Sequence, residues 1–322
     1  MSLMDRISDL PDTLLLRVLS LLPSAKDVVA TMVLSKRWEF LWLSVPRLVF
    51  DDQDIVEYAA QDIIVWMRAA NNFTVDEMII EIDSSSCASP VILPKFLYTE
   101  CTMLVTLNLN SVILADFSSP IDDNVTLFTV RVPSLKRLVL HTSENRDRDD
   151  SDGFVINAPC LEYFNIIDHK GGFFKRLYLC LSTSKDLYPD DTLVHRLVHL
   201  TLCTCDTEWL NLLVSMLRDS PSLRALKLEQ YHGLPAHHLR AYWNEPSSVP
   251  VCLLSSLETL EWVNYEGTEE EKEVVGFMFR NGSCLKKVTI SSKSNDCNKK
   301  LEMIKELTWS IRCSPTCQLA FD

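Results

Sequence analysis

Four side chains in the middle of the chain have the residue types of a zinc site. They follow the spacing H-x3-H-x3-C-x-C and are His195, His199, Cys203 and Cys205. Imidazole nitrogens and thiolates are the ligands that Zn²⁺ prefers in proteins. In the stretch LVHLTLCTC, however, Leu200 and Leu202 alternate as the inward residues of a strand, which leaves Cys203 on the opposite, exposed face. Because Cys205 falls in the following turn, the two thiols would need special folding to reach one ion, and we expect no metal.

Motifs for common nucleotide or acyl-transfer chemistry do not occur in the sequence. Phosphate-binding loops need glycines so that the backbone can approach the phosphate, and the 322-residue chain has only 7 glycines. It contains no G-x-G-x-x-G, no G-x-x-x-x-G-K-[ST] and no G-x-S-x-G. No nucleophile, base and orienting group can be placed together. We therefore expect no catalytic residue and no cofactor, and an enzymatic or metal-binding module is the weakest of three alternatives.

Composition argues against nucleic acid and membranes as partners. The net charge is −13, from 44 acidic and 31 basic residues, whereas a phosphate backbone demands basic patches. The apolar start is broken by acidic residues and by Arg17, unlike a signal peptide, and no run approaches the ~20 apolar residues of a membrane span. The 11 cysteines form no C-x-x-C pair, which indicates buried thiols in a reducing compartment. We expect a cytoplasmic or nuclear protein.

The elements of the first fifty residues are predicted from their apolar spacing. One helix face is formed by six residues at three- and four-residue steps, namely Leu10, Leu14, Leu15, Val18, Leu19 and Leu22. Pro23 ends this helix, Ser24 and Asp27 cap a second one, and Ser35 can cap a third turn that carries Trp38 and Trp42. Three short helices cannot bury so many large apolar groups internally. Part of this surface must therefore face another structure.

The stretch from Asp5 to Phe50 resembles a plant-type F-box. The resemblance is carried by the Leu10-Pro11 opening, the L-x-x-L-P step that ends at Pro23, and the block LSKRW followed by Leu41 and Trp42. It implies docking onto a Skp-type adaptor, which links the chain to a cullin scaffold with a RING protein. The residues expected to bind the adaptor are Leu10, Pro11, Leu14, Leu15, Val18, Leu19, Leu22, Val33, Leu34, Lys36, Arg37, Trp38, Leu41 and Trp42. The alternative is a helical cap whose apolar residues only form the core of the next domain.

A six-residue template, L-x-x-L-x-L with apolar substitutions, recurs beyond residue 100. Its eight copies begin at Leu104, Leu135, Leu161, Phe174, Leu197, Leu223, Leu257 and Leu285. No copy can bury its apolar face alone, so successive strands must stack into a parallel sheet and a solenoid. This pattern resembles irregular leucine-rich repeats. The alternative is an ordinary α/β domain whose strands happen to contain leucine.

One interval between copies is too short for a repeat. The step from Leu161 to Phe174 is 13 residues, whereas leucine-rich repeats take about 20–29. Plant F-box proteins of this type carry another repeat at this point, so we expect a shortened variant with a local defect in the solenoid. The structural alternative is an antiparallel hairpin across Gly171 and Gly172.

The segment from about residue 250 to 322 resembles the FBD region of plant F-box proteins. Thr268 and Glu271 form a predicted capping box, and the acids Glu269 to Glu271 are expected to be a solvated helix start rather than a docking patch. Val274, Val275, Met278 and Phe279 are the predicted buried stripe, followed by a stop at Gly282. A second helix, about 298–312, is expected to bury Leu301, Ile304, Leu307 and Ile311, and a final strand has Cys317, Leu319 and Phe321 on one side.

Together these patterns predict an α/β chain with an N-terminal three-helix F-box, an irregular leucine-rich-repeat solenoid and a C-terminal FBD-type α/β cap. The expected boundaries are 1–50 for the F-box, 51–97 for a helical linker and first strand, 98–250 for the repeats, and 251–322 for the FBD region, which continues the repeat sheet.

The function implied by the resemblance is that of a substrate receptor in a Skp/cullin/F-box ubiquitin ligase, which performs no bond chemistry itself. The outward strand positions are the expected contacts for an unidentified protein target, and they are Thr106, Asn108, Arg137, Val139, Tyr163, His199, Thr201, Lys227 and Glu261. The alternative is a leucine-rich interaction scaffold that has lost ligase function.

Overall fold

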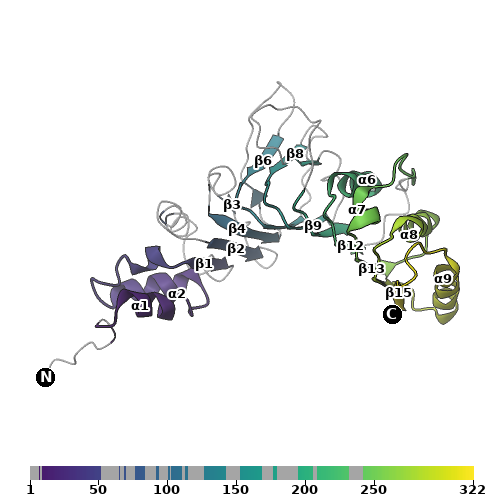
Figure 1. Cartoon of the computed structure of the whole chain (residues 1–322). Helices are drawn as coiled ribbons and strands as arrows, with labels where there is room; N and C mark the ends of the chain where they lie inside the picture. Colours follow the sequence, from purple (N-terminus) through teal and green to yellow (C-terminus); the bar gives the residue numbers. More distant parts are fainter. Residues whose placement is uncertain are drawn as a thin grey trace. The chain divides into compact units, whose positions relative to one another are not determined.

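The structure is a computed structural model of the chain. It describes residues 7, 9–51, 65, 69, 77–83, 92–93, 101, 103–110, 113–114, 127–142, 153–168, 177–179, 195–205, 209–231 and 242–322. Two compact units are present, one formed by residues 1–117 with 131–139 and the other by residues 118–130 with 140–322. Figure 1 labels the elements of both units.

The first unit begins with two short helices, α1 (Asp12–Leu19) and α2 (Ala25–Ala30). The third predicted helix is replaced by two 3₁₀ segments, η1 (Thr31–Val33) and η2 (Leu41–Ser44). Between them the chain turns through bonds that span three residues, such as Trp38 N–H to the Ser35 carbonyl at 2.9 Å. Aromatic side chains lose rotamer freedom against the preceding helical turn, and the crowded sequence here favours these tighter turns over a regular α-helix.

Short strands follow the helices in the first unit. They are neighbours in the order β1 (Arg47–Asp51), β2 (Glu77–Asp83), β4 (Leu104–Asn110) and β7 (Arg137–Thr142), whose first residues belong to this unit. The pairs β1–β2 and β2–β4 are parallel. A separate parallel pair is formed by β3 (Ile92–Leu93) and β5 (Ile113–Leu114).

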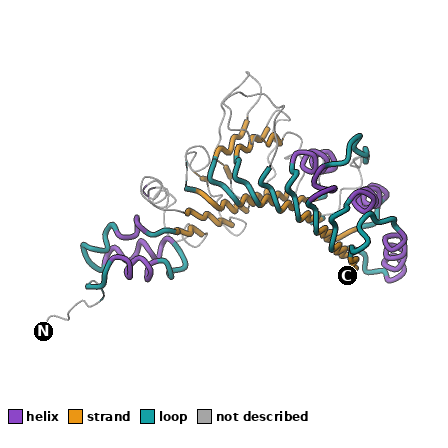
Figure 2. Tube along the Cα trace, in the orientation of Figure 1, coloured by secondary structure: helices purple, strands orange, loops and turns teal. Residues whose placement is uncertain are grey.

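Among the described residues, the second unit contributes six parallel strands in chain order to the large sheet. They are β9 (Tyr163–Asp168), β11 (His199–Cys203), β12 (Ala225–Glu229), β13 (Thr259–Tyr265), β14 (Lys287–Ser292) and β15 (Gln318–Phe321). Their registers are regular, apart from a shift after Val263 in β13. The strands form a continuous row in Figure 2, which confirms the predicted sheet of parallel strands.

The template residues form the core beneath these strands. In seven of the eight copies all three apolar positions are buried, with at most 3% of the side chain exposed. One example is the copy at Leu223, in which Leu223, Leu226 and Leu228 are all buried. Two of the three lie on a strand and alternate with more exposed residues, as the burial pattern of β12 shows. The repeat is therefore a packing unit as well as a sequence pattern.

The copy at Phe174 does not follow the others. Its strand, β10 (Leu177–Leu179), pairs in parallel with β8 (Gly153–Asn157) in a separate three-stranded sheet that also contains β6 (Leu127–Arg131). Strand β9 pairs directly with β11, so this copy is bypassed. The antiparallel hairpin considered for Gly171 and Gly172 is wrong, because β9 and β10 lie in different sheets; the two glycines themselves lie outside the described residues.

The segments that return from one strand to the next change along the chain. Strands β6 and β8 immediately precede the turns that lead into β7 and β9. Further along, helices take this position: α6 (Trp209–Asp219), α7 (Val251–Ser255) and α8 (Glu269–Asn281) lead into β12, β13 and β14. In Figure 1 these helices lie on one side of the strand row. The apolar side chains of the strands are thereby covered by helices in the second unit.

Serine hydroxyls join successive repeats at the turns. Ser256 Oγ donates to the Leu223 carbonyl at 2.9 Å, and Ser314 Oγ donates to the Leu285 carbonyl at 2.6 Å. In the first unit Ser134 Oγ donates to the Leu104 carbonyl at 2.9 Å. Each acceptor is the first leucine of the preceding copy. These bonds give a side-chain donor to a backbone carbonyl at or just before the start of the preceding strand.

The predicted capping box at the start of α8 is confirmed. Thr268 Oγ1 accepts from the N–H of Glu271, and Glu271 Oε2 accepts from the N–H groups of Thr268 and Glu266 at 3.0 and 3.1 Å. The predicted stripe of Val274, Val275, Met278 and Phe279 is buried. The expectation of a fully solvated acidic start is wrong for Glu271, which is only 5% exposed because its carboxylate turns back to accept these backbone donors.

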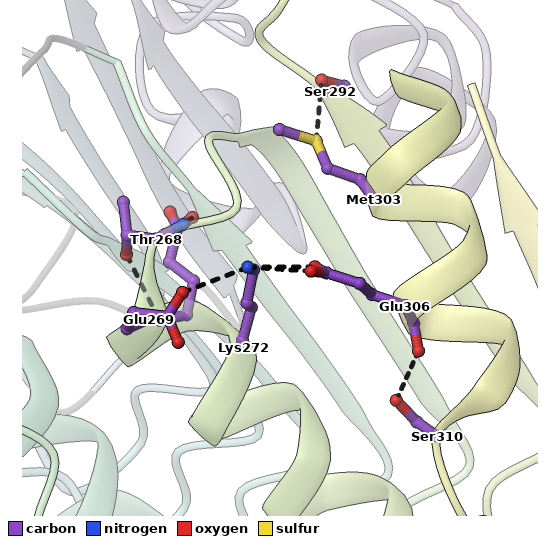
Figure 3. Close-up of polar contacts among 8 residues, drawn as sticks. Thr268, Glu269, Lys272, Ser292, Met303, Glu306 and Ser310 are labelled. Atoms are coloured by element: carbon purple, nitrogen blue, oxygen red, sulfur yellow. Dashed lines mark hydrogen bonds and ion pairs between the residues drawn. The ribbon is translucent and has the colours of Figure 1, made fainter. Parts of the chain in front are cut away.

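The last helix, α9 (Cys297–Trp309), is rotated relative to its prediction. Met303 and Leu307 are buried, whereas Leu301 is half exposed and Ile311 lies beyond the helix and is 79% exposed. Figure 3 shows two contacts that favour this rotation: Lys272 lies between Glu269 and Glu306, at 3.1 and 3.0 Å, and the Met303 sulfur accepts from the Ser292 hydroxyl at 3.5 Å. Met303 also lies against Gly267, where a Cβ would come within 2.9 Å of its Cε atom.

Replacement by Ala should have different effects on stability at two glycines of the C-terminal region. A Cβ at Gly282 would lie 2.6 Å from the Met278 carbonyl oxygen, a backbone atom that cannot move away easily. Gly282→Ala should therefore lower the free energy of unfolding by about 1–3 kcal/mol. A Cβ at Gly276 would approach only the flexible end of Arg280, at 3.1 Å, so Gly276→Ala should be neutral or stabilise α8 by up to about 1 kcal/mol. Urea unfolding of both variants measures the contrast, and equal destabilisation would contradict this packing of the turn.

The burial of Glu271 predicts a pH dependence of stability. Burial raises the pKa of this carboxyl from 4.5 to about 7, against the opposing effect of the backbone donors. Between these pH values the folded protein holds a proton that the unfolded chain has released, so the wild-type free energy of unfolding should fall as pH rises. Relative to Glu271→Gln, the fall should be about 2–3 kcal/mol. Urea unfolding from pH 4.5 to 8 checks this, with Glu273→Gln on the exposed face of α8 as the control; parallel pH curves for wild type and Glu271→Gln would overturn it.

Candidate functional site

Residues 7–50 carry a set of exposed apolar side chains. We call it the N-terminal rim, and it is formed by six large apolar side chains that are between 45% and 87% exposed: Leu14, Val18, Leu21, Val33, Leu34 and Phe40. Soluble proteins expose large apolar patches mainly where another molecule covers them. The rim is therefore the strongest candidate for a docking surface in the first unit.

Helix α1 divides its leucines between two faces. Leu15 and Leu19 are fully buried, while Leu14 and Val18, one position earlier in each case, are about half exposed. Leu21 continues the exposed face, since it lies three residues after Val18. The helix thus closes the local core with one stripe and presents the other to solvent.

Beneath the rim the two tryptophans form part of the core. Trp38 and Trp42 are 2% and 5% exposed, and Val28 and Val29 of α2 are buried with them. The neighbouring residues Val33 and Leu34, at the end of η1, are 87% and 57% exposed. The large rings thus support the turns whose aliphatic residues face solvent.

An ion pair ties α1 to the turn after η1. Arg37 Nε lies 3.1 Å from Asp12 Oδ1, and Arg37 Nη2 contacts the same oxygen. Both side chains are partly exposed, so the pair adds at most about 1 kcal/mol to stability. It places a cation beside the rim.

The expected adaptor-binding residues fall into three groups. The exposed group consists of Pro11, Leu14, Val18, Val33, Leu34, Lys36 and Arg37. The group of intermediate exposure consists of Leu10, Leu22 and Leu41. The buried group consists of Leu15, Leu19, Trp38 and Trp42. The buried group cannot meet a partner directly in this structure, because these side chains already fill the core. Sequence reasoning missed Leu21 and Phe40, although the three-residue step from Val18 to Leu21 was a usable signal.

The outward strand positions are less uniform than expected. Arg137, His199 and Glu261 are exposed, while Asn108, Tyr163 and Lys227 are intermediate. The expected exposure is wrong for Thr106, Val139 and Thr201, which are at most 9% exposed. Strands lie about 4.8 Å apart, so a short side chain is easily covered by longer ones on adjacent strands.

The accessible positions of the second unit form two in-register rows. Tyr163 pairs with His199, and their rings lie 6.0 Å apart. In the next row Lys227 Nζ lies 2.8 Å from Glu229 and 3.8 Å from Glu261. Nearby carboxylates raise the pKa of the Lys227 ammonium against the effect of its partial burial. This face therefore offers aromatic, cationic and anionic groups within a short distance.

The histidine and cysteine motif does not form a cluster of ligands. His195 and His199 are exposed, whereas Cys203 is buried, contrary to its expected exposure. Among the described residues no group of three or more His, Cys, Asp or Glu side chains could hold a metal ion. Within the same residues, no helix is long and apolar enough to cross a membrane.

Family models match an N-terminal and a C-terminal part of the chain. Residues 7–50 match the F-box domain, and residues 245–290 match FBD. The rim lies within the first match and the capping box of α8 lies within the second.

Relatives in Arabidopsis thaliana match nearly the whole chain. A probable FBD-associated F-box protein is 46% identical, with 99% of this chain and 100% of the relative covered. A putative FBD-associated F-box protein is 45% identical over 94% of this chain and 100% of the relative. An F-box/FBD/LRR-repeat protein is 35% identical over 99% of both. No solved structure matches the chain.

The alignments also reveal an internal difference in length. The first alignment runs over 423 positions, and the chain has 322 residues, so at least 101 positions of that relative have no counterpart here. Because nearly all of both chains is covered, these positions are internal. This agrees with the expectation of a shortened variant.

Substitutions in the rim and in the tryptophans beneath it should have different effects on stability. Trp38→Ala removes a buried ring and should destabilise residues 9–51 by about 3–5 kcal/mol, whereas Leu34→Ala should change stability by less than about 0.5 kcal/mol. Hydrogen exchange measured by mass spectrometry on the full chain reports this region directly. Similar protection in the two variants would contradict the division into core and rim.

Proposed function

The chain belongs to the FBD-associated F-box proteins, and on this premise we propose that it is the substrate-recruiting subunit of a Skp/cullin/F-box ubiquitin ligase. F-box domains generally bind Skp-type adaptors, and F-box proteins are typically non-catalytic. The protein would hold a target near a ubiquitin-charged conjugating enzyme and so raise the effective concentration of the target's lysines. We propose that it does so in the cytoplasm or nucleus.

The observation that carries this proposal is the N-terminal rim. The segment that matches the F-box domain exposes Leu14, Val18, Val33 and Leu34 while burying both tryptophans. We propose that the adaptor covers these aliphatic side chains, with Lys36 and Arg37 at the edge of the contact. Apolar groups at the centre and charged groups at the edge are the usual anatomy of a protein interface.

Target recruitment is assigned to the strand row. We propose that the strands and their return segments form an irregular leucine-rich-repeat solenoid and that the N-terminal segment of two α-helices and two 3₁₀ segments acts as the F-box. The accessible residues Tyr163, His199, Lys227 and Glu261 would then contact the target. Their mixture of aromatic and oppositely charged groups suits a protein or peptide better than a polyanion.

Adaptor binding tests the proposal. The double variant Val33→Ala and Leu34→Ala should reduce co-purification of a Skp-type adaptor by at least about tenfold, because each truncation removes apolar area that the adaptor would bury. The matched control is Val251→Ala with Leu254→Ala on α7, whose side chains are comparably exposed at 56% and 53%. This control should bind like wild type.

The outcomes distinguish the alternatives. Equal recovery of wild type and the Val33/Leu34 variant would contradict the assignment of the rim. A folded wild-type protein that recovers no adaptor would instead favour the leucine-rich scaffold without ligase function.

A further inference from the structure

Strand β11 ends with two thiols side by side. Cys203, its last residue, is 1% exposed, and Cys205 is half-buried two residues later. The backbone N–H of Cys205 donates to Cys203 Sγ, with nitrogen and sulfur 3.4 Å apart. The turn between them is held in place, because the N–H of Thr204 donates to the Glu229 carbonyl at 3.0 Å.

The surroundings of the two sulfurs differ. The N–H of Tyr231 donates to Cys205 Sγ at 3.1 Å, and a donor of this kind stabilises negative charge on sulfur. Around Cys203 the neighbouring thiol and burial raise the pKa, against the backbone N–H groups of Cys205 and Tyr231, which lower it. Because Cys203 is 1% exposed and Cys205 is only half-buried, hydrogen peroxide reaches Cys205 first, with the Cys203 thiol next to it.

We propose that Cys203 and Cys205 form a redox-modification site, which closes to an intrachain disulfide in reaction with hydrogen peroxide. The Cys205 thiolate attacks the peroxide, the O–O bond breaks, and hydroxide leaves as Cys205 becomes a sulfenic acid. Cys203 then attacks the sulfenyl sulfur and loses its proton, the S–O bond breaks, and water leaves. Two thiols and one peroxide thus give one disulfide and two waters.

Other described cysteines lack this arrangement. Cys297 and Cys313 are more exposed, but neither has a second cysteine two residues away. Cys252 is fully buried, its thiol donates to the Leu217 carbonyl at 3.2 Å, and burial raises its pKa to about 11. A disulfide is favoured where a second thiol is already adjacent, rather than where exposure is greatest.

Closure would change the edge of the strand row. The Cys205 sulfur would leave the N–H of Tyr231, which follows β12, and would be fixed to the end of β11. The proposal does not depend on ligase function, so its test can succeed or fail independently of adaptor binding.

Mass spectrometry of the full-length protein tests this site. Both cysteines lie in one tryptic peptide, residues 197–218, which contains no other cysteine. With stoichiometric hydrogen peroxide, the mass of this peptide should fall by two hydrogen atoms, and both of its cysteines should stop reacting with an alkylating reagent. This loss of alkylation should be about tenfold faster than the loss of alkylation at Cys297. Reduction should restore both thiols.

Two variants separate the roles of the sulfurs. In Cys203→Ser, Cys205 should accumulate as a sulfenic acid that a dimedone probe traps. In Cys205→Ser, Cys203 should remain a free thiol under the same treatment. The proposal is overturned if Cys297 is consumed before the pair in wild type, or if Cys203→Ser yields no trapped sulfenic acid.

Discussion

A short parallel strand satisfies its backbone only through its neighbours on both sides. In the second unit the starts of β11 to β15 are bonded to the repeat before them, as when the N–H groups of Glu258 and Thr259 donate to the Arg224 carbonyl. Each repeat also buries three apolar side chains that it could not bury alone. Removing an apolar residue from one copy therefore affects the adjacent copies as well. The rest of the molecule depends on this mutual support between neighbouring repeats.

Features with a local physical cause were predictable from the sequence. The L-x-x-L-x-L template predicted the parallel strands because period-two burial is a property of the strand itself, and all three positions of the Leu197 copy are buried. The capping box at Thr268 was equally predictable, since its donors and acceptors lie within four residues. The family resemblance at both ends was confirmed by the matches to F-box and FBD.

Features that depend on distant partners were not predictable. Nothing local distinguishes the copy at Phe174 from the others, yet β10 pairs with β8 instead of joining the main row. The rotation of α9 follows from Lys272 and Ser292, which precede the helix and contact Glu306 and Met303. Thr201 resembled an exposed strand residue, but it is covered across the sheet. In the N-terminal segment, the sequence indicated an excess of apolar groups without showing that the tryptophans would fill the core.

The division between rings and aliphatic residues has a physical basis. A segment with two short helices has little interior, and two indole rings fill it efficiently, which leaves Val33 and Leu34 no place inside. These residues lie at the end of η1, so the turn presents them on a backbone that the buried rings hold in place. A partner surface would thus meet a preformed shape and would pay little conformational entropy on docking.

The serine bonds between turns repeat with the same chemistry from Ser134 to Ser314. At these three turns a serine hydroxyl meets the carbonyl of the first leucine of the preceding copy, so these turns present similar edges to their neighbours. Excision of one complete module would join two equivalent edges, whereas a cut inside a module would leave a carbonyl and an apolar surface without counterparts. Members of such a family can accordingly differ in length by whole modules while the register of the remaining strands is preserved.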